Sequence, residues 1–435
     1  MVPAGSPLGG FVGNAFRLML APAISKEILT MTRPYSELWL DATQGMLRNR
    51  LLWIVLACSL VVAPAFAQHL HELYYNNVNW TDTDLTSLTG GPILYPQGVA
   101  AFYTPNNDLH VFYASNVSLN FHVHQLYFNG SSWSDQDLTA VTGGVSSSNS
   151  SGMSGFAIGN AQYVYFCGSD GSVHEYSYGN NGNFNWVDAR LPSVYPKGCE
   201  FAPAGLVAFT TATNNTRHVF FHSHATQTTR TIRHLVFNGK VWKNQNITAL
   251  SKGAKAQSAN YLSGFSIGDA QYVYFTDKNG HVHEFSFVSS WQDLDVTAAS
   301  GGVPGGTFTG SGTASFVVPG TTQREVYYAA GNNQDVHRAT FHNNTWTDSD
   351  LSSLTGTSGV ISQSQITGFA TTPNNQLHVY FSSFGNGDVN QLFYNGSAWS
   401  ESTLPSVPVI VIGGPCTMAG FAIGNLQHVY YVSQN

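Results

Sequence analysis

Residues 123–139 read Val-His-Gln-Leu-Tyr-Phe-Asn-Gly-Ser-Ser-Trp-Ser-Asp-Gln-Asp-Leu-Thr, and variants of this stretch return along the chain. The tryptophan is the clearest mark of the repeat. It recurs with gaps of 53, 53, 56, 49, 55 and 53 residues, at Trp80, Trp133, Trp186, Trp242, Trp291, Trp346 and Trp399. A period of about 50 residues is typical of repeat architectures, so this period indicates the fold.

Each repeat has two halves, and both have the features of a hairpin. The first half runs from a Gly-aromatic start to a strand such as His-Val-Phe-Tyr at 110–113, and the second half is the stretch 123–139. The strand segments are separated by Asn-Gly, Asn-Asn and Gly-Gly turns, which favour hairpins. Seven copies of each half are present. No stretch after residue 67 has convincing helical periodicity, so we expect no helix there. The sequence therefore predicts an all-β, seven-bladed β-propeller with four-stranded blades.

The two ends of the repeat array predict that the ring is closed. The array begins with a second half, at His69, and finishes with a first half, from Gly420 to Tyr431. Joined together, these halves complete one blade and leave no edge strand unpaired. The composition agrees with a well-buried β protein, because 9% of residues are charged, 13% are aromatic and 43 are Gly. This balance argues against disorder.

Residues 46–67 predict a secretory signal. They have a basic start at Arg48 and Arg50, an apolar run over residues 51–62 and small residues that end at Ala67. The apolar run is about a dozen residues long, whereas a membrane-spanning helix needs about 20. We expect cleavage after Ala67 and a secreted or periplasmic protein without membrane insertion.

Two alternatives to a cleaved signal are a membrane anchor and a lipoprotein site at Cys58. Because a signal begins a chain, we interpret residues 1–45 as an upstream extension that is disordered and lies outside the mature protein. The folded domain is then 68–435. The basic and apolar leader suits a bacterium.

Charge limits the range of partners. Residues 68–435 hold 12 Lys plus Arg and 21 Asp plus Glu, a formal charge of −9, which argues against nucleic acid as a partner. Ten of the twelve basic residues fall between Arg190 and Lys278. This basic sector is either a solvated rim or a field that steers an anionic ligand.

Cysteine is sparse after the signal. In an exported chain Cys167 and Cys199 are the nearest candidates for a disulfide, and a third thiol at Cys416 has no obvious partner. No Cys/His spacing typical of zinc is present.

Catalysis and metal binding are both disfavoured. A propeller glycosidase needs two placed carboxylates. Most Asp residues instead lie in the repeated turn after Trp, at Asp84, Asp137, Asp295 and Asp350, where a hydrogen bond to their own turn is the simpler explanation. His-x-His pairs at 69/71, 122/124, 222/224 and 281/283 share a strand face, yet we expect no carboxylate or third His beside them. The sequence predicts no catalytic residue, no metal and no cofactor.

Recognition of a neutral polar ligand fits the repeated residue types better. Sugar sites combine an aromatic surface with planar hydrogen-bonding groups. Each repeat carries Trp, and most carry Glu or Gln at one fixed place. The alternative is that Trp fills the gap between blades and Glu is a surface strand residue.

At these positions the chain resembles the fucose-specific lectins, β-propellers of fungi and bacteria whose repeats read approximately Ile-Arg-Val-Tyr, a turn, Ile-x-Glu and then Gly-x-x-Trp. The corresponding stretches here are Leu109-His-Val-Phe, Val123-His-Gln-Leu and Asn129-Gly-Ser-Ser-Trp, and the resemblance covers nearly all of 69–435. It implies that fucose or a related sugar is held between neighbouring blades by an Arg, a Glu and an aromatic residue. The Arg is replaced here, at His110, Tyr163, His218, Tyr272, Glu325, His378 and His428.

The resemblance predicts several sugar sites between blades. The predicted residues are His428 with Glu72, His110 with Gln125, His378 with Gln391, Tyr163 with Glu175, and Tyr272 with Glu284, together with Trp80, Trp133, Trp186, Trp291 and Trp399. No sugar is expected where Glu325 and Arg338 have exchanged the usual charges, or at His218 with His234. We expect a multivalent lectin whose partners are glycans. The alternatives are a scaffold that binds protein partners and, third, a glycosidase or lyase.

Overall fold

The computed structural model describes residues 68–94, 98–115, 120–148, 152–179, 182, 184–192, 205–224, 229–257, 261–305, 312–357, 359–360, 365–383, 387–406 and 417–434. The predicted signal at 46–67 and the stretch before it lie outside the described residues. So do Cys58, Cys199 and Cys416.

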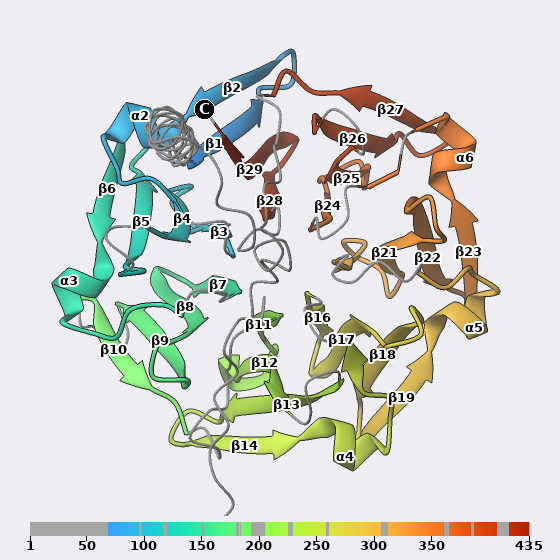
Figure 1. The fold of residues 1–435 in the computed structure, drawn as a ribbon, viewed down its shortest axis with the longest axis horizontal. Helices are drawn as coiled ribbons and strands as arrows, with labels where there is room; N and C mark the ends of the chain where they lie inside the picture. The colour runs from blue at the N-terminus through green and yellow to red at the C-terminus, as the bar shows by residue number, and fades with distance from the viewer. Residues whose placement is uncertain are drawn as a thin grey trace, which may run out of the picture. The chain divides into compact units, whose positions relative to one another are not determined.

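Seven four-stranded antiparallel sheets form the blades of a ring (Figure 1). We number them I to VII from the blade that begins with β3. The innermost strands are β3 (Ala100–Tyr103), β7 (Met153–Ile158), β11 (Leu206–Thr210), β16 (Ser263–Ile267), β20 (Ala314–Val317), β24 (Thr367–Ala370) and β28 (Met418–Ile423). The second strands are β4 (Leu109–Ala114), β8 (Ala161–Cys167), β12 (Arg217–His224), β17 (Ala270–Thr276), β21 (Arg324–Ala330), β25 (Leu377–Ser382) and β29 (Leu426–Gln434).

The two outer strands of each blade complete the sheets. The third strands are β5 (Val123–Phe128), β9 (Val173–Tyr178), β13 (Thr229–Phe237), β18 (Val282–Phe287), β22 (Asp335–His342), β26 (Val389–Tyr394) and β1 (Gln68–Tyr75). The outermost strands are β6 (Trp133–Asp137), β10 (Val187–Arg190), β14 (Trp242–Asn246), β19 (Trp291–Asp295), β23 (Thr345–Asp350), β27 (Trp399–Thr403) and β2 (Trp80–Asp84). A short strand, β15 (Ala256–Gln257), also pairs with β13.

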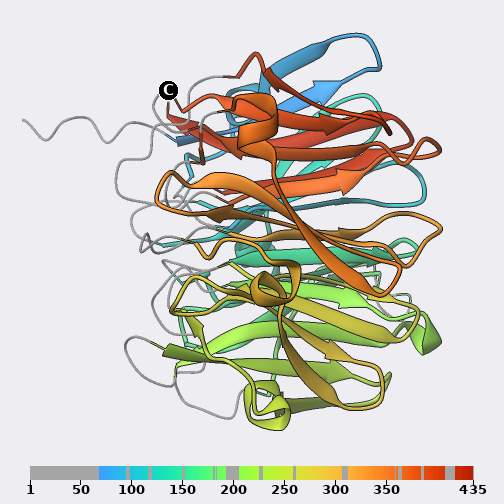
Figure 2. The same cartoon turned by 90° about the vertical axis from the view of Figure 1, so that its right-hand side faces the viewer.

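The ring closes through blade VII, whose strands come from both ends of the described chain. β1 pairs with β29 from Gln68↔Gln434 to Tyr75↔Gln427. The innermost strands contact one another in sequence and β28 contacts β3, and residues of all seven blades line a central channel of about 260 Å3. Figure 2 shows the blades from the side, with their strands running from one face of the ring toward the other. The predicted seven-bladed propeller, closed by two terminal half-blades, is confirmed.

The hydrophobic core lies between the blades. Each repeat Trp packs edge-on against a buried aromatic ring of the preceding blade, with ring centroids from 5.8 Å apart for Trp291 and Phe220 to 6.5 Å apart for Trp346 and Tyr274. The other five pairs are Trp80–Tyr380, Trp133–Tyr430, Trp186–Phe112, Trp242–Tyr165 and Trp399–Tyr327. Trp therefore fills the space between blades, and its repetition follows from this packing.

The Asp-Leu-Thr motif after the outermost strand forms one turn of helix. In blade I the side chain of Asp137 caps α3 (Leu138–Thr142) by accepting from the backbone N–H of Ala140, the Leu138 side chain is buried, and Thr139 Oγ1 accepts from the N–H of Val123 at 2.9 Å. The same arrangement recurs at α2 (Leu85–Thr89), α4 (Ile247–Ser251), α5 (Val296–Ser300) and α6 (Leu351–Thr355). The motif thus ties the outermost strand to the third strand.

The expectation of no helix after residue 67 was therefore wrong for these five short helices. Five residues make too short a segment for helical periodicity to be visible in the sequence. The expectation that the Asp side chain bonds its own turn is confirmed, because the capping bond is that bond.

Candidate functional site

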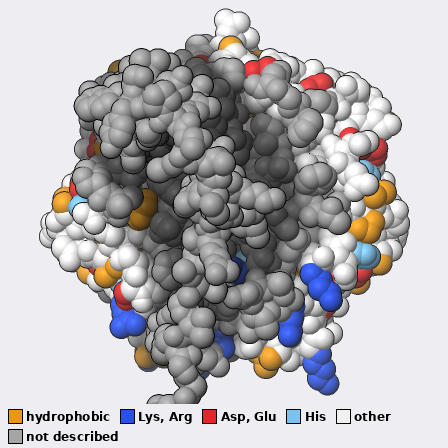
Figure 3. All heavy atoms as spheres, in the orientation of Figure 1, with side chains coloured by type: hydrophobic (Ala, Val, Ile, Leu, Met, Phe, Trp, Pro, Cys, Tyr) orange, Lys and Arg blue, Asp and Glu red, His pale blue; other side chains and the backbone are white. Residues whose placement is uncertain are grey.

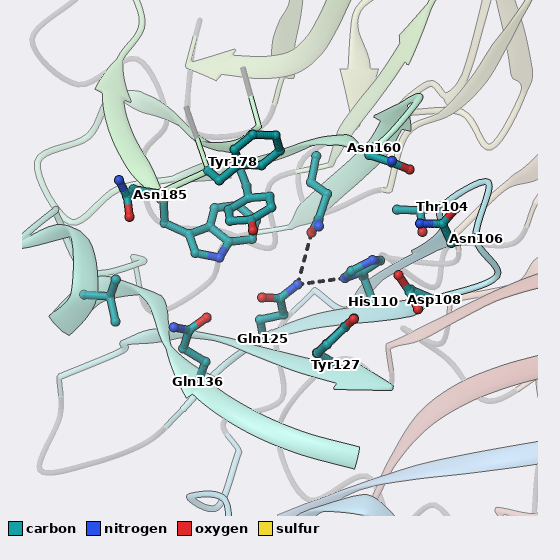
Figure 4. Close-up of a pocket in the computed structure, with 14 residues that line it drawn as sticks. Thr104, Asn106, Asp108, His110, Gln125, Tyr127, Gln136, Asn160, Tyr178 and Asn185 are labelled. Atoms are coloured by element: carbon teal, nitrogen blue, oxygen red, sulfur yellow. Dashed lines mark hydrogen bonds between the residues drawn. The ribbon is translucent and has the colours of Figure 1, made fainter. Parts of the chain in front are cut away.

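A cavity of about 540 Å3 opens between blades I and II (Figure 4). Strands β4, β5 and β6 supply one wall, and β8, β9 and the turn before β10 supply the other. Blade I contributes Thr104, Asn106, Asp108, His110, Gln125, Tyr127, Gln136 and Val141, and blade II contributes Asn160, Gln162, Tyr178, Phe184, Asn185 and Trp186. His110, Gln125 and Trp186, which the sequence predicted to belong to sugar sites, are among them.

Three buried side chains form a hydrogen-bonded chain across this gap. Gln125 Nε2 lies 2.8 Å from His110 Nδ1 and 3.1 Å from Gln162 Oε1, so the amide donates to both. Burial lowers the pKa of His110 to about 4, which leaves the imidazole neutral at pH 7. Because Nδ1 accepts, the ring proton sits on Nε2, a buried atom with no hydrogen-bond partner in the structure. Figure 4 shows the amide oxygen of Gln125 turned away from His110.

Aromatic rings line the blade II side of the cavity. The Tyr178 ring lies 5.5 Å from the Trp186 ring and 6.1 Å from the Phe184 ring, measured between centroids. The side chain of Phe184 is 67% exposed. An exposed aromatic ring beside buried ones is a surface on which the C–H face of a ligand can stack.

The turn that carries Phe184 is longer than its equivalents. Seven residues separate Tyr178 from Trp186, whereas four separate Phe128 from Trp133 in blade I. The insertion places Phe184 and Asn185 beside the cavity. Local chain length therefore distinguishes this gap from its neighbours.

The residues that line the cavity carry little net charge. Asp108 is the one carboxylate among the lining residues, and these residues include no Lys or Arg. Burial and the nearby Asp108 raise the pKa of Tyr127, so this phenol keeps its proton. Amide groups at Asn106, Asn160 and Gln136 complete the polar lining. Such a mixture of aromatic faces and neutral donors and acceptors fits a neutral polar molecule.

Two other gaps contain a predicted pair in hydrogen-bond contact. His428 Nδ1 lies 2.8 Å from Glu72 Oε1, and the Tyr430 hydroxyl donates to the same oxygen at 3.0 Å. Gln391 Nε2 lies 2.8 Å from His378 Nδ1 and 3.1 Å from Gln427 Oε1. The second group repeats the His-Gln-Gln arrangement of the cavity between blades I and II.

Two further predicted pairs lie beside an arginine of the next blade. Glu175 accepts from Arg217 Nη1 at 2.7 Å, and the Arg217 guanidinium carbon lies 4.3 Å from the centroid of the Tyr163 ring. Arg324 Nε lies 3.4 Å from Glu284 Oε2. Its guanidinium carbon lies 4.5 Å from the Tyr272 centroid.

The two pairs that were expected not to bind sugar also make internal contacts. His218 Nδ1 lies 2.9 Å from His234 Nε2. Arg338 donates to Glu325 from Nε at 2.8 Å and from Nη2 at 2.7 Å, so the exchanged charges form an ion pair within blade V.

The expectation that no carboxylate lies beside the His-x-His pairs was wrong. His69, His122 and His281 each place Nδ1 2.7 Å from a capping Asp, at Asp84, Asp137 and Asp295. The second His of each pair contacts another Asp of the outermost strand, as at His124 and Asp135, 2.9 Å apart. Each blade supplies its own carboxylates, because the outermost strand runs beside the third strand. In the described part of the chain, no group of three or more His, Cys, Asp or Glu side chains could hold a metal ion.

Several lining residues escaped the sequence analysis. Gln162 follows an Ala at the start of β8, and only the assembled ring shows that it faces Gln125. Phe184 had a visible signal, because the turn before Trp186 is three residues longer than the turn before Trp133.

The basic sector and the disulfide were also sequence expectations. Figure 3 shows Lys and Arg side chains at the lower edge of the face that Figure 1 also presents, where Figure 1 places β13, β14 and α4. Lys240, Lys243, Lys252, Lys255 and Lys278 are exposed, whereas Arg217 and Arg230 are buried.

Cys167 is disulfide-bonded. No helix among the described residues has the length and apolar character to span a membrane.

No protein-family model matches the chain, and no curated protein matches it. Among solved structures, the Aleuria aurantia lectin with alpha-methyl-L-fucoside is 17% identical over 74% of this chain and 98% of the lectin, with a TM-score of 0.46. The SapL1 lectin with alpha methyl fucoside is 20% identical over 72% of this chain and 98% of the lectin, with a TM-score of 0.46. AofleA from Arthrobotrys oligospora is 11% identical over 84% and 93%, with a TM-score of 0.45.

A sialidase also resembles the chain. The Trypanosoma rangeli sialidase is 8% identical over 82% of this chain and 56% of the enzyme, with a TM-score of 0.41. The Aleuria lectin is described as a six-bladed β-propeller, one blade fewer than here. The predicted resemblance to fucose-specific lectins is confirmed as a similarity of fold. These comparisons assign no ligand to the chain.

Proposed function

We propose that this protein is a non-catalytic, secreted lectin that binds neutral sugars between its blades, with its principal site between blades I and II. The observation that carries the proposal is the cavity in which buried amides, a neutral imidazole and an exposed Phe184 ring face one space. The amides of Gln125 and Gln162 offer hydrogen bonds to sugar hydroxyls. The rings of Tyr178 and Phe184 offer a surface to the apolar face of a sugar ring.

The charge of the cavity supports a neutral ligand over an acidic one. Asp108 is the one charged lining residue, and a carboxylate repels sialic or uronic acids. A single carboxylate is also one fewer than a glycosidase requires. Fucose or a related neutral sugar is consistent with the solved lectins of similar fold, two of which are described with a methyl fucoside.

Multivalency is part of the proposal. The His-Gln-Gln group recurs between blades VI and VII at His378, Gln391 and Gln427, and His428 with Glu72 lies between blades VII and I. Weak sites on one rigid ring act together on a dense glycan surface, because each binding event raises the effective concentration for the next.

The first test is a glycan array probed with the purified protein, followed by calorimetric titration of the best monosaccharide. Phe184→Ala should weaken binding about fivefold, because stacking on an aromatic ring contributes about 1 kcal/mol. The matched control is Val288→Ala, since Val288 is 76% exposed at the equivalent turn of blade IV. It should bind as the wild type does.

Three results would contradict the proposal. They are an array without signal at high protein density, binding that free monosaccharide does not compete, and equal affinity of Phe184→Ala and the wild type. Binding to a glycoprotein that monosaccharide leaves unchanged would indicate a protein-binding scaffold instead.

A further inference from the structure

We infer that three arginines close three of the seven gaps between blades, so that sugar binding is confined to the other four. The inference rests on the proposed function. The arginines are Arg217, Arg324 and Arg338, and their gaps lie between blades II and III, IV and V, and V and VI. They set an upper limit on the number of sites that the ring offers.

The register of the strands shows which positions correspond between gaps. Gln125 pairs with Phe112 across β4 and β5, and Glu175 pairs with Tyr165 in the same way across β8 and β9. Five positions therefore surround each gap, two on one blade and three on the next. They are His110, Gln125, Gln162, Tyr178 and Trp186 in the open gap, and Tyr163, Glu175, Arg217, Phe237 and Trp242 in the gap between blades II and III.

The side chain of Arg217 fills the second of these gaps. Its guanidinium carbon lies 4.2 Å from the Phe237 centroid and 5.2 Å from the Trp242 centroid, and Tyr163 covers it at 4.3 Å. The ion pair with Glu175 is almost completely buried, with 5% and 4% of the two side chains exposed. Aromatic faces and a carboxylate, the groups that a sugar would contact, are therefore already engaged.

The gap between blades IV and V repeats this geometry. The guanidinium carbon of Arg324 lies 3.8 Å from the Phe341 centroid and 5.3 Å from the Trp346 centroid. Tyr272 and Glu284 take the places of Tyr163 and Glu175. Two gaps with different surrounding sequences thus hold an arginine at the same position, the start of the second strand of the following blade.

The third arginine enters its gap from the opposite wall. Arg338 occupies the place of Gln125, forms a bidentate pair with Glu325, and lies 5.8 Å from the Tyr394 centroid and 5.5 Å from the Trp399 centroid of blade VI. The resemblance implies that an Arg, a Glu and an aromatic residue hold a sugar together, but in these three gaps the guanidinium itself lies against the aromatic rings. Its carboxylate partner is buried, with 4%, 3% and 0% of the Glu175, Glu284 and Glu325 side chains exposed. A sugar could enter only by displacing the guanidinium and leaving a buried carboxylate unpaired, which is strongly unfavourable. The predicted sites at Tyr163 with Glu175 and at Tyr272 with Glu284 are then structural.

Crystals of the wild-type protein soaked with the monosaccharide from the array test the inference. We expect sugar density between blades I and II and none in the three gaps that hold an arginine. Sugar bound between blades II and III, IV and V, or V and VI would overturn it. The double variant Arg217→Gln with Glu175→Gln copies the Gln125–Gln162 pair and should open a cavity bounded by Tyr163 and Phe237. A gap that stays closed in this variant would also overturn the inference.

A measurement without sugar separates this inference from the proposed function. Arg217→Ala and Arg324→Ala each remove one guanidinium, and millimolar methylguanidinium should raise the melting temperature of these variants in a saturable way. The control is Arg190→Ala, because the Arg190 side chain is 62% exposed and its removal leaves no slot. If the wild type binds no sugar but the two variants are rescued, the proposed function fails and the closed gaps stand. Absence of rescue in both variants, with the control unchanged, would refute the arginine slots.

Discussion

Individual histidines fall into two classes according to what surrounds the imidazole. Burial lowers the pKa of His110, His218 and His378 to about 4, so these rings between the blades stay neutral. For three histidines on the third strands burial also opposes the charge, but it is outweighed by the hydrogen bonds that their Nδ1 atoms donate to the carboxylates of Asp188, Asp293 and Asp348. These bonds raise the pKa of His174, His283 and His337.

The two classes predict a maximum of stability near pH 6.5. The histidines with a raised pKa stabilise the fold fully below the pKa of about 6.5 that they have in the unfolded chain. This stabilisation is lost as the pH rises through their pKa in the folded protein. The lowered group acts in the opposite sense. Between pH 6.5 and 4 these imidazoles are protonated in the unfolded chain but stay neutral in the folded protein. Acidification to pH 4 therefore lowers the free energy of unfolding by up to about 3 kcal/mol for each buried ring.

Thermal unfolding measured from pH 4 to pH 8 checks this profile. His218→Gln should flatten the acid side, because one neutral imidazole is then missing. A melting temperature that stays constant or rises from pH 6.5 to pH 4 would show that the imidazoles are not buried as described.

At the scale of the element, the Asp-Leu-Thr turn offers a natural experiment. Asn246 caps α4 in blade III with the same side-chain bond to the backbone that Asp137 makes in blade I. Asp137→Ala should therefore lower the free energy of unfolding by about 1 kcal/mol, whereas Asp137→Asn should lower it by much less. Chemical denaturation of both variants gives the comparison. An equal loss in the two variants would assign the effect to the Asp137–His122 contact instead of the cap.

The elements also show what the sequence could and could not predict. The strands and their order followed from the Trp period, because packing between blades repeats with the chain. The capping Asp was recognised as a turn residue, but its five-residue helix was too short to predict. His110 and Gln125 were found from their fixed positions. The sequence did not show that Arg217 closes the gap between blades II and III, because this depends on which residue of the next blade faces Glu175.

For the whole molecule, we expect closure to make the first described strand, β1, as stable as an internal strand. Leu73 in β1 and Leu392 in β26 occupy the same position of their blades, and both are 0% exposed. Leu73→Ala and Leu392→Ala should each cost about 2–5 kcal/mol. A cost below about 1 kcal/mol for Leu73→Ala alone, measured by denaturant unfolding, would show that β1 frays and that the ring is not fastened there.

The pairing of β1 with β29 also sets the order of events when the protein is made. β1 is the first described strand to leave the ribosome and β29 is the last, so β1 has no partner on its inner side until the final strand has emerged. A message truncated before residue 426 would remove β29 and leave β1 and β28 each without a neighbour. Domains usually begin to fold from the N-terminus during synthesis, but this ring can be completed only after β29 has emerged.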